Sequence, residues 1–597
     1  MGLFNYAFYL SLLCTVAVYA DKRTVNHNIK DNIPGYAYLP IVQTVHGIIQ
    51  GKTVISKDGR YSHEYLGIPY ATPPIGRLRF QKPLPYTGQW SGVLDAQMCG
   101  PSCMQPRLPR SGRRTIDIWN PDNDFKENCL TLNIWTPYPR RSNSSVMLWI
   151  HGDSFIKGSS SLPIHNGKTL ASHGDVIVVT FNYRLGALGF LASGDERIEG
   201  NMGLHDQRMA MRWVKRNIKV FGGNPDSVTI FGESSGAASV GFHLLISSGE
   251  KLFHRAILQS GSPLAYWASM TKTQANQRLK QLLKKLKCED DDNLVHCLSL
   301  IPAEMIVKAQ QDLASVQFGH FSWVPVVDHV FIRDNPRYLL KNSHIKQTNI
   351  LLGTNKNEGS RWMVYLLNFL KYKQPFMLKS KELHSLIDRV FYELSDSARS
   401  KIKNFYFKIA HNKTAPKFNR DLYQIMLEDR HMFCPMLDTA KGFSGWGNDV
   451  FMYRLKHRTR KEDWPKWMGV VHGTDLQYVF GAPVEEPRVF NDAERKLSIR
   501  MMTYWSNFAK YGNPTTGQRH VIPKWPQFKN TTEKFVKFKV TEDLEIGQYF
   551  RDKNCDLWRE IETEALEYVS EKKSSISELP TESDTFGRGN SFYYNVF

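Results

Sequence analysis

A pentapeptide near the middle of the chain has the residue types of a nucleophilic turn. It reads Gly232-Glu233-Ser234-Ser235-Gly236, with the apolar residues 228–231 before it and a helix-forming segment, residues 237–245, after it. A serine on a sharp strand-to-helix turn projects its hydroxyl above the sheet edge, and the glycines allow close backbone approach. This context predicts Ser234 as a nucleophile; the alternative is an ordinary loop serine.

A nucleophilic serine needs a base, and the base needs an acid that orients it. On turns of this kind the order along the chain is serine, acid, histidine. Glu358 follows the apolar residues 350–352, and His472 lies on a loop flanked by glycines. Both are candidates, although spacing alone does not select His472 from the 19 histidines.

Short apolar runs alternate with helical stretches along the chain. Residues 206–220 have helical spacing, and no period of 20–50 residues repeats, which excludes solenoids and propellers. The alternation predicts an α/β fold with a mostly parallel central sheet that helices cover on both faces. The strands, almost wholly apolar as in a doubly covered sheet, are expected at residues 146–150, 176–181, 228–231, 256–258, 350–352 and 450–453.

The composition indicates the class of protein, and the two ends of the chain indicate where its folded domain begins and ends. With 597 residues, 42% of them apolar, the chain is neither disordered, collagen-like nor a disulfide scaffold. Residues 1–20 are uncharged around a short apolar core, which predicts a signal peptide cleaved before Asp21; the alternative is an uncleaved membrane anchor. Residues 21–569 are expected to form a single domain, and the polar residues 570–597 a disordered tail.

Other features agree with a secreted, extracellular protein. Sequons at Asn143, Asn412 and Asn530 are expected to carry glycans on surface loops. Of the 8 cysteines, Cys14 is lost with the signal peptide. The odd number that remains predicts at least one free or intermolecular thiol.

The chain is strongly basic. It has 77 Lys and Arg against 57 Asp and Glu, a formal net charge of +20, and part of the charge lies in residues 107–114 and 280–287. Such a surface favours an anionic glycan or membrane as partner and repels cations. The alternative is a solvated surface without a specific polyanion, and no specific nucleic acid is expected.

Three segments have the form of signatures of one enzyme family. Residues 127–135 contain a cysteine signature with Asn128 where Asp is usual, residues 231–236 a serine signature, and residues 464–473 a histidine segment. Through them, residues 45–558 resemble the type-B carboxylesterase/cholinesterase family, the cholinesterase branch in particular. The resemblance implies an α/β-hydrolase fold and a triad of Ser234, His472 and Glu358.

The resemblance also implies disulfides and a substrate site. The cysteine pairs are Cys103–Cys129, Cys288–Cys297 and Cys434–Cys555, which leaves Cys99 unpaired. In cholinesterases the residue matching Trp119 faces the choline headgroup, since an indole face attracts a quaternary ammonium; the alternative is a tryptophan packed on its own loop. The other implied positions are Glu233, an anionic helper, and Trp267 and Phe321, which line the acyl pocket.

The chain departs from this pattern at two places. The family's oxyanion hole takes backbone N–H groups from Ser235, where Ala is usual, and from Asp153 and Ser154, where Gly is usual. Side chains there restrict the dihedrals that aim the donors. Arg361 and Trp362 stand where cholinesterases usually carry aromatics, and Arg361 would repel a cationic substrate.

Other chemistries are not supported. The segment ending in Gly167-Lys168-Thr169 lacks the first glycine of a P-loop, and Gly67 replaces the second histidine of a zinc motif begun by His63-Glu64. No metal and no cofactor are expected.

Two hypotheses follow. The first is a secreted, cholinesterase-like serine hydrolase of small-molecule carboxylic esters that works through an acyl-enzyme. The second is a catalytically impaired binding, adhesion or ligand-scavenging protein, suggested by Asp153, Ser154, Arg361 and the charge. A homodimer formed through a helix bundle is left open.

Overall fold

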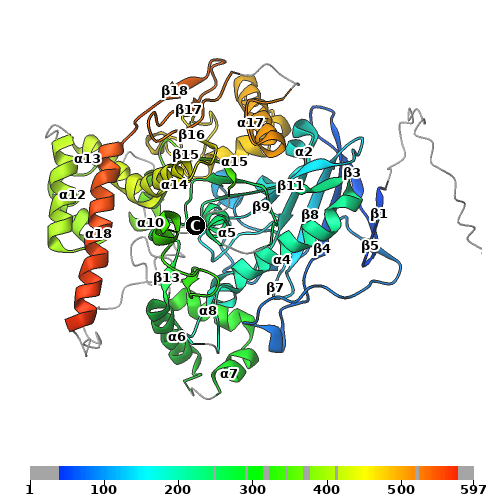
Figure 1. Ribbon diagram of the computed structural model, residues 1–597, viewed down its shortest axis with the longest axis horizontal. Coiled ribbons are helices and arrows are strands. Elements are labelled where there is room, and N and C mark those ends of the chain that lie inside the picture. The colour runs from blue at the N-terminus through cyan, green and yellow to red at the C-terminus, as the bar shows by residue number, and fades with distance from the viewer. Residues whose placement is uncertain are drawn as a thin grey trace, which may run out of the picture. The chain divides into compact units, whose positions relative to one another are not determined.

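A large sheet lies at the centre of the protein (Figure 1). Within the described residues it has eleven strands, parallel from β17 to β10 and antiparallel at both ends. In spatial order they are β18 (Glu545–Gly547), β17 (Phe535–Phe538), β16 (Val450–Leu455), β15 (Asn349–Asn355), β12 (Arg255–Gln259), β11 (Gly223–Glu233), β9 (Ser144–Ile150), β10 (Ile177–Phe181), β8 (Thr131–Pro137), β4 (Tyr61–Pro69) and β3 (Lys52–Ile55).

The predicted α/β class and all six predicted strands are confirmed. The largest difference is β11, which begins at Gly223 because an irregularity between Gly223 and Val228 lets it pair with β9 again further upstream. The predicted helix at 206–220 is α4 (Met202–Asn217) followed by the 3-10 turn η3 (Ile218–Phe221). Gly222, with φ 88°, ends the turn in a conformation that suits glycine.

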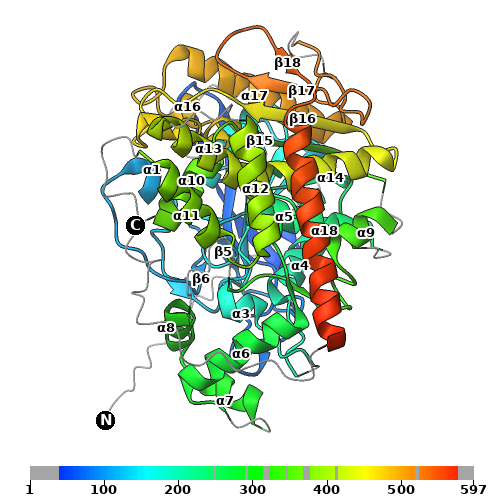
Figure 2. The same cartoon turned by 90° about the vertical axis from the view of Figure 1, so that its left-hand side faces the viewer.

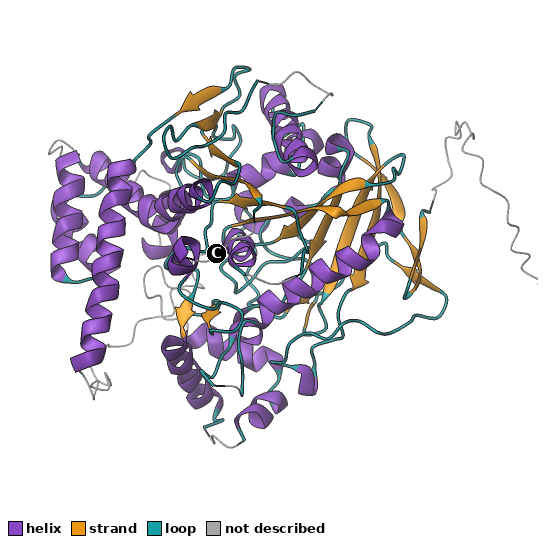
Figure 3. Cartoon of the chain, viewed as in Figure 1, coloured by secondary structure: helices purple, strands orange, loops and turns teal. Residues whose placement is uncertain are grey.

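Helices cover both faces of the sheet, and each face has its own apolar core (Figure 3). Side chains alternate along β9, so that Leu148 and Ile150 join one core, whereas Met147 and Trp149 join the other. The first core includes α4 and α5 (Ser235–Leu245), and the second includes α2 (Lys168–Gly174) and α17 (Asp492–Tyr511). Burial on both faces explains why the parallel strands are almost wholly apolar.

The last described helix, α18 (Asp552–Ser575), lies beside α12 (Asp396–Ile409) (Figure 2). Lys401 forms an ion pair with Glu560 at 2.6 Å, and Nε1 of Trp558 donates to the hydroxyl of Tyr406 at 2.8 Å. The helix continues to Ser575, so the predicted tail that starts at residue 570 begins with helix.

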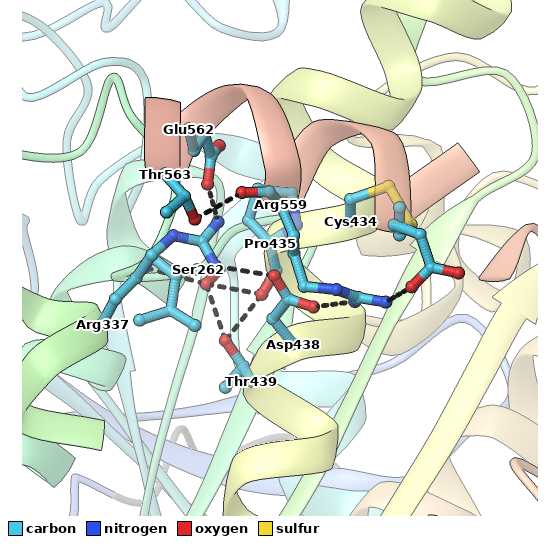
Figure 4. Close-up of polar contacts among 12 residues, drawn as sticks. Ser262, Arg337, Cys434, Pro435, Asp438, Thr439, Arg559, Glu562 and Thr563 are labelled. Carbon is cyan, nitrogen blue, oxygen red and sulfur yellow. Dashed lines mark hydrogen bonds and ion pairs between the residues drawn. A yellow bond between two sulfur atoms is a disulfide. The ribbon is translucent and has the colours of Figure 1, made fainter. Parts of the chain in front are cut away.

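A disulfide and a charge network attach α18 to α14 (Cys434–Gly445). Cys434 is bonded to Cys555, and Asp438 accepts from Arg337 and Arg559 at 2.6 Å each (Figure 4). The other disulfides are Cys103–Cys129 and Cys288–Cys297, and Cys99 is free.

The structure describes residues 39–575, except 196, 247–249, 290–292, 314–321, 343–346, 368–376, 410–414 and 518–522. The predicted signal peptide, Phe321, Asn412 and residues 576–597 lie outside the described residues. Within these ranges, no helix has the length and apolar character needed to cross a membrane. The remaining α-helices of the described residues are α1 (Arg114–Asp117), α3 (Gly186–Phe190), α6 (Lys272–Leu286), α7 (Leu294–Leu300), α8 (Ala303–Leu313), α9 (Pro336–Asn342), α10 (Gly359–Leu367), α11 (Ser380–Val390), α13 (Pro416–Glu428), α15 (Thr474–Val479) and α16 (Ala482–Glu485).

Candidate active site

Ser234 lies on the turn between β11 and α5, at the carboxyl edge of the parallel strands. Its backbone is at φ 55° and ψ −122°, a conformation that few non-glycine residues adopt and that is often retained for function. The N–H of Ser234 donates to the carbonyl of Gln259 at 2.9 Å. A Cβ on Gly236 would lie 2.1 Å from the carbonyl oxygen of Ile150, so this second glycine of the turn is required for the close approach of β9.

His472 lies between η6 (Lys466–Met468) and α15, and its ring is held by Glu358. Nδ1 of His472 lies 2.6 Å from Oε2 of Glu358, a fully buried residue between β15 and α10. Oε1 of Glu358 accepts from the Ser260 hydroxyl and from the Asn355 N–H, both at 2.6 Å. Burial opposes the charge of Glu358, but His472 and these hydrogen bonds outweigh it, so the pKa of Glu358 lies below its usual value.

The other ring nitrogen of His472 contacts Glu233. Nε2 lies 3.1 Å from Oε1 of Glu233, whose side chain is buried. Burial raises the pKa of Glu233 to about 8. Burial also opposes an imidazolium, but Glu233 and Glu358 outweigh it and raise the pKa of His472 to about 9. The two carboxylates, one at each ring nitrogen, therefore favour a protonated His472.

Replacing Glu233 by glutamine should therefore move the acid limb of the kcat/KM profile to lower pH by about one unit. A protonated imidazole cannot act as a base, so the wild-type rate should rise as the pH approaches about 9, the pKa of His472. Glutamine removes the negative charge beside Nε2, which lowers the pKa of His472. Profiles with a neutral aryl ester would check this, with Glu485→Gln as the control variant. An acid limb at the same pH in Glu233→Gln would contradict the prediction.

The turn after β9 carries Asp153 and Ser154. Their φ angles are 79° and 64°, and Phe155 follows at 62°, all in the left-handed region that L residues rarely enter. The N–H of Phe155 donates to Oγ of Ser235 at 3.2 Å, and its carbonyl accepts from the Gly186 N–H at 2.8 Å. These bonds hold the turn in a conformation typical of glycine although glycine is absent at the three positions.

A small cavity lies beside Ser234. Its volume is about 30 Å³, enough for a water molecule but not for an ester, so a substrate must displace some of the lining side chains. The structure thus brings the predicted nucleophile and base into one cavity with most of the residues expected to bind substrate. The lining consists of Trp119, Asp153, Ser154, Glu233, Ser234, Arg361, Trp362 and His472.

Arg361 lies over the indole of Trp119. Its guanidinium carbon is 5.6 Å from the Trp119 ring centroid and 5.6 Å from that of Trp464, and both Arg361 and Trp119 are buried. Gly473, with φ 81°, makes room for this tryptophan, because a Cβ there would lie 2.8 Å from Cζ2 of Trp119. A cation over an indole face is stabilised by the ring quadrupole. The face that could bind a ligand cation therefore already holds one from the chain.

Other predicted residues lie elsewhere. Trp267 is buried, donates from Nε1 to the carbonyl of His431 at 2.8 Å, and is not among the described residues that line the cavity. Ser235 begins α5 and reaches the site through its contact with Phe155. Asn143 and Asn530 are exposed, as glycan acceptors must be.

Sequence reasoning missed three contributors to the site. Ser260 and Asn355 fix Glu358, and Lys157 lies 3.1 Å from Asp153. The spacing of four residues between Asp153 and Lys157 was the only local signal for the last pair. In the described part of the chain, no group of three or more His, Cys, Asp or Glu residues is placed to hold a metal ion.

Comparison with known proteins assigns the family. Residues 39–558 match the model of the carboxylesterase family. The chain belongs to the carboxylesterase family. It is 38% identical to a cholinesterase of Mus musculus over 89% of this chain and 88% of that protein. It is also 38% identical to the acetylcholinesterases of Danio rerio, over 87% of each chain, and of Bungarus fasciatus, over 88% of this chain and 87% of that one. This carboxylesterase is a carboxylic ester hydrolase, and its predicted resemblance to cholinesterases is confirmed.

Proposed function

We propose that the protein is a secreted serine esterase that uses Ser234, His472 and Glu358 and acts on esters without a quaternary ammonium group. The observation that carries the proposal is the shared cavity. Ser234 and His472 line it together, while Glu358 holds the far side of the His472 ring at 2.6 Å. The order of these residues along the chain is also that of enzymes with a nucleophile on a strand-to-helix turn.

In the proposed reaction, the Ser234 hydroxyl attacks the ester carbonyl carbon and its proton passes to Nε2 of His472. Glu358 stabilises the imidazolium, and the tetrahedral intermediate then expels the alcohol, which takes the proton from His472. An acyl group remains on Ser234. Water attacks this acyl-enzyme and one of its protons passes to His472. The second tetrahedral intermediate then expels the Ser234 oxygen, which takes that proton from His472, and the carboxylic acid leaves.

The turn at Asp153 and Ser154, together with the first N–H of α5 at Ser235, is the proposed oxyanion site. The turn residues line the cavity of Ser234, and the first N–H groups of a helix have no partner within the helix. Each well-aimed donor of this kind contributes about 3 kcal/mol to catalysis. The positive φ values of the turn support the proposal, because they are the dihedrals that the glycines of the family allow.

The substrate class follows from Arg361. Relatives of this chain are named for the hydrolysis of choline esters, but here a guanidinium occupies the face of Trp119. Two unit charges about 6 Å apart at an effective dielectric constant of about 20 repel by about 3 kcal/mol. A quaternary ammonium is therefore disfavoured in this cavity relative to a neutral alcohol group.

Replacing Arg361 by methionine should raise the preference for acetylthiocholine over phenyl acetate by about 10- to 100-fold. Methionine keeps much of the volume but removes the cation from the indole face. Arg361→Lys, which keeps the charge, is the matched control and should retain the wild-type preference. The ratio of kcat/KM values for the two esters is the measurement, and an equal change in both variants would assign the effect to volume rather than charge.

The experiment that tests the proposal as a whole uses the full chain from a secretory host. The protein purified from the culture medium should react with a fluorophosphonate at Ser234 and should hydrolyse phenyl acetate faster than acetylthiocholine. The three disulfides and the predicted signal peptide support secretion. Preference for acetylthiocholine would refute the substrate class. Absence of both labelling and turnover would favour the binding-protein alternative.

A further inference from the structure

The turn that carries Asp153 also carries the partner of its charge. Nζ of Lys157 lies 3.1 Å from Oδ2 of Asp153, and the side chains are only 14% and 9% exposed. Asp153 lines the cavity of Ser234, whereas Lys157 lines a second cavity of about 340 Å³, and Trp119 borders both cavities. The ion pair thus links the linings of the two cavities.

The backbone around Lys157 is held firmly, which fixes where its ammonium can reach. The Gly158 N–H donates to Oε1 of Gln105 at 3.0 Å, and Nε2 of Gln105 donates to the Gly158 carbonyl at 2.9 Å. The N–H groups of Ile156 and Lys157 both point to the carbonyl of Asp153 at 3.4 Å. Lys157 is therefore placed one turn of chain from Asp153 by contacts that do not involve either charge.

An uncompensated carboxylate at position 153 would oppose the proposed reaction. Negative charge develops on the ester oxygen during attack, and it is stabilised by donors fixed in a site that excludes water. A buried carboxylate without a partner is also costly, so it would move toward any donor within reach, including those meant for the ester oxygen. The Lys157 ammonium removes both difficulties, since it neutralises Asp153 and gives it a fixed partner.

We propose that Lys157 is a positioning residue that neutralises Asp153 and holds its carboxylate away from the ester oxygen, so that a turn carrying a carboxylate can still stabilise an oxyanion. The role rests on the proposed function, because it places the ester oxygen in the cavity of Ser234. The ion pair thus leaves the turn without net charge, as a glycine at position 153 would.

A set of variants of the full chain tests the role. Lys157→Met should lower kcat for phenyl acetate by about 100-fold, with KM changed by less than about threefold, since the loss is in the transition state. A trifluoromethyl ketone forms an oxyanion when it adds to the serine. Its inhibition constant should rise by about the same factor as kcat falls. Lys157→Arg should remain within about fivefold of wild type, because the charge is kept.

Removing the carboxylate should make Lys157 dispensable. Asp153→Gly/Lys157→Met should regain at least about tenfold in kcat over Lys157→Met and should equal Asp153→Gly. Lys168→Met is the matched control, since Lys168 forms a comparable half-buried ion pair with Glu485 at 2.7 Å outside the site, and it should leave kcat unchanged.

Two results would overturn the role while the wild type is active: an unchanged kcat in Lys157→Met, or the same loss in Lys157→Met and in the double variant. If Lys157→Met is not secreted, Asp153→Gly is compared with the double variant instead. A lower kcat in the double variant would show that Lys157 is needed even without Asp153, and this result would also overturn the role. A wild-type protein without turnover that depends on Ser234 would instead refute the proposed function, and this role with it.

Discussion

Replacing Ser234 by alanine is expected to lower kcat for phenyl acetate by about 10⁶-fold and to abolish fluorophosphonate labelling. Alanine removes the oxygen that would carry the acyl group, so neither the covalent intermediate nor the phosphonylated serine can form. Residual hydrolysis from substrate binding and oxyanion donors should remain above the rate in water. Turnover with excess substrate and the stoichiometry of labelling are the two measurements.

Ser239→Ala supplies the control for this loss. Ser239 lies one turn further along α5, and its hydroxyl donates to the Ser235 carbonyl at 3.0 Å without lining the cavity. This variant should be labelled as fully as the wild type, with kcat within about tenfold. Labelling of Ser234→Ala would show that the reactive serine lies elsewhere in the chain.

The parts of this protein that local sequence encodes were predictable. The parallel strands contain almost wholly apolar runs because helices cover both faces of the sheet, and each run is visible within three to six residues. The same holds for Ser234, whose turn needs small residues at fixed offsets; a Cβ on Gly236 would collide with β9. Chain order and position made Glu358 and His472 candidates, but only the family resemblance selected them, since a single loop acid or histidine has no local signature.

What could not be predicted depends on side chains brought together from distant segments. Arg361 was expected to repel cations, but its position over Trp119 and Trp464 requires α10, the loop closed by Cys103–Cys129 and the segment before η6 to meet. The small volume beside Ser234 arises from the same packing. Trp267 was expected to line the acyl pocket. It lies in the core instead, where its Nε1 donates to the carbonyl of His431.

The environment of Glu358 makes its replacement by glutamine informative. Its Oε1 faces two donors, of which the Ser260 hydroxyl can rotate, whereas the Asn355 N–H cannot. A glutamine at position 358 satisfies Asn355 only with its amide oxygen on that side. Its NH₂ group then faces Nδ1 of His472, so this nitrogen must accept and the proton of the neutral ring must lie on Nε2.

Glu358→Gln is therefore expected to lower kcat by about 10⁴-fold while the protein still folds and is still secreted. A ring protonated at Nε2 cannot take the Ser234 proton, and the charge that would stabilise an imidazolium is gone as well. The kcat for phenyl acetate and the rate of fluorophosphonate labelling should fall together, because both need the serine to be deprotonated.

Ser260→Ala is the matched control, since it removes one hydrogen bond to Glu358 but keeps the charge and the tautomer. Its kcat should stay within about tenfold of the wild-type value. A Glu358→Gln enzyme as active as Ser260→Ala would mean that another group orients His472, and the buried carboxyl of Glu233, 3.1 Å from Nε2, would be the first to test.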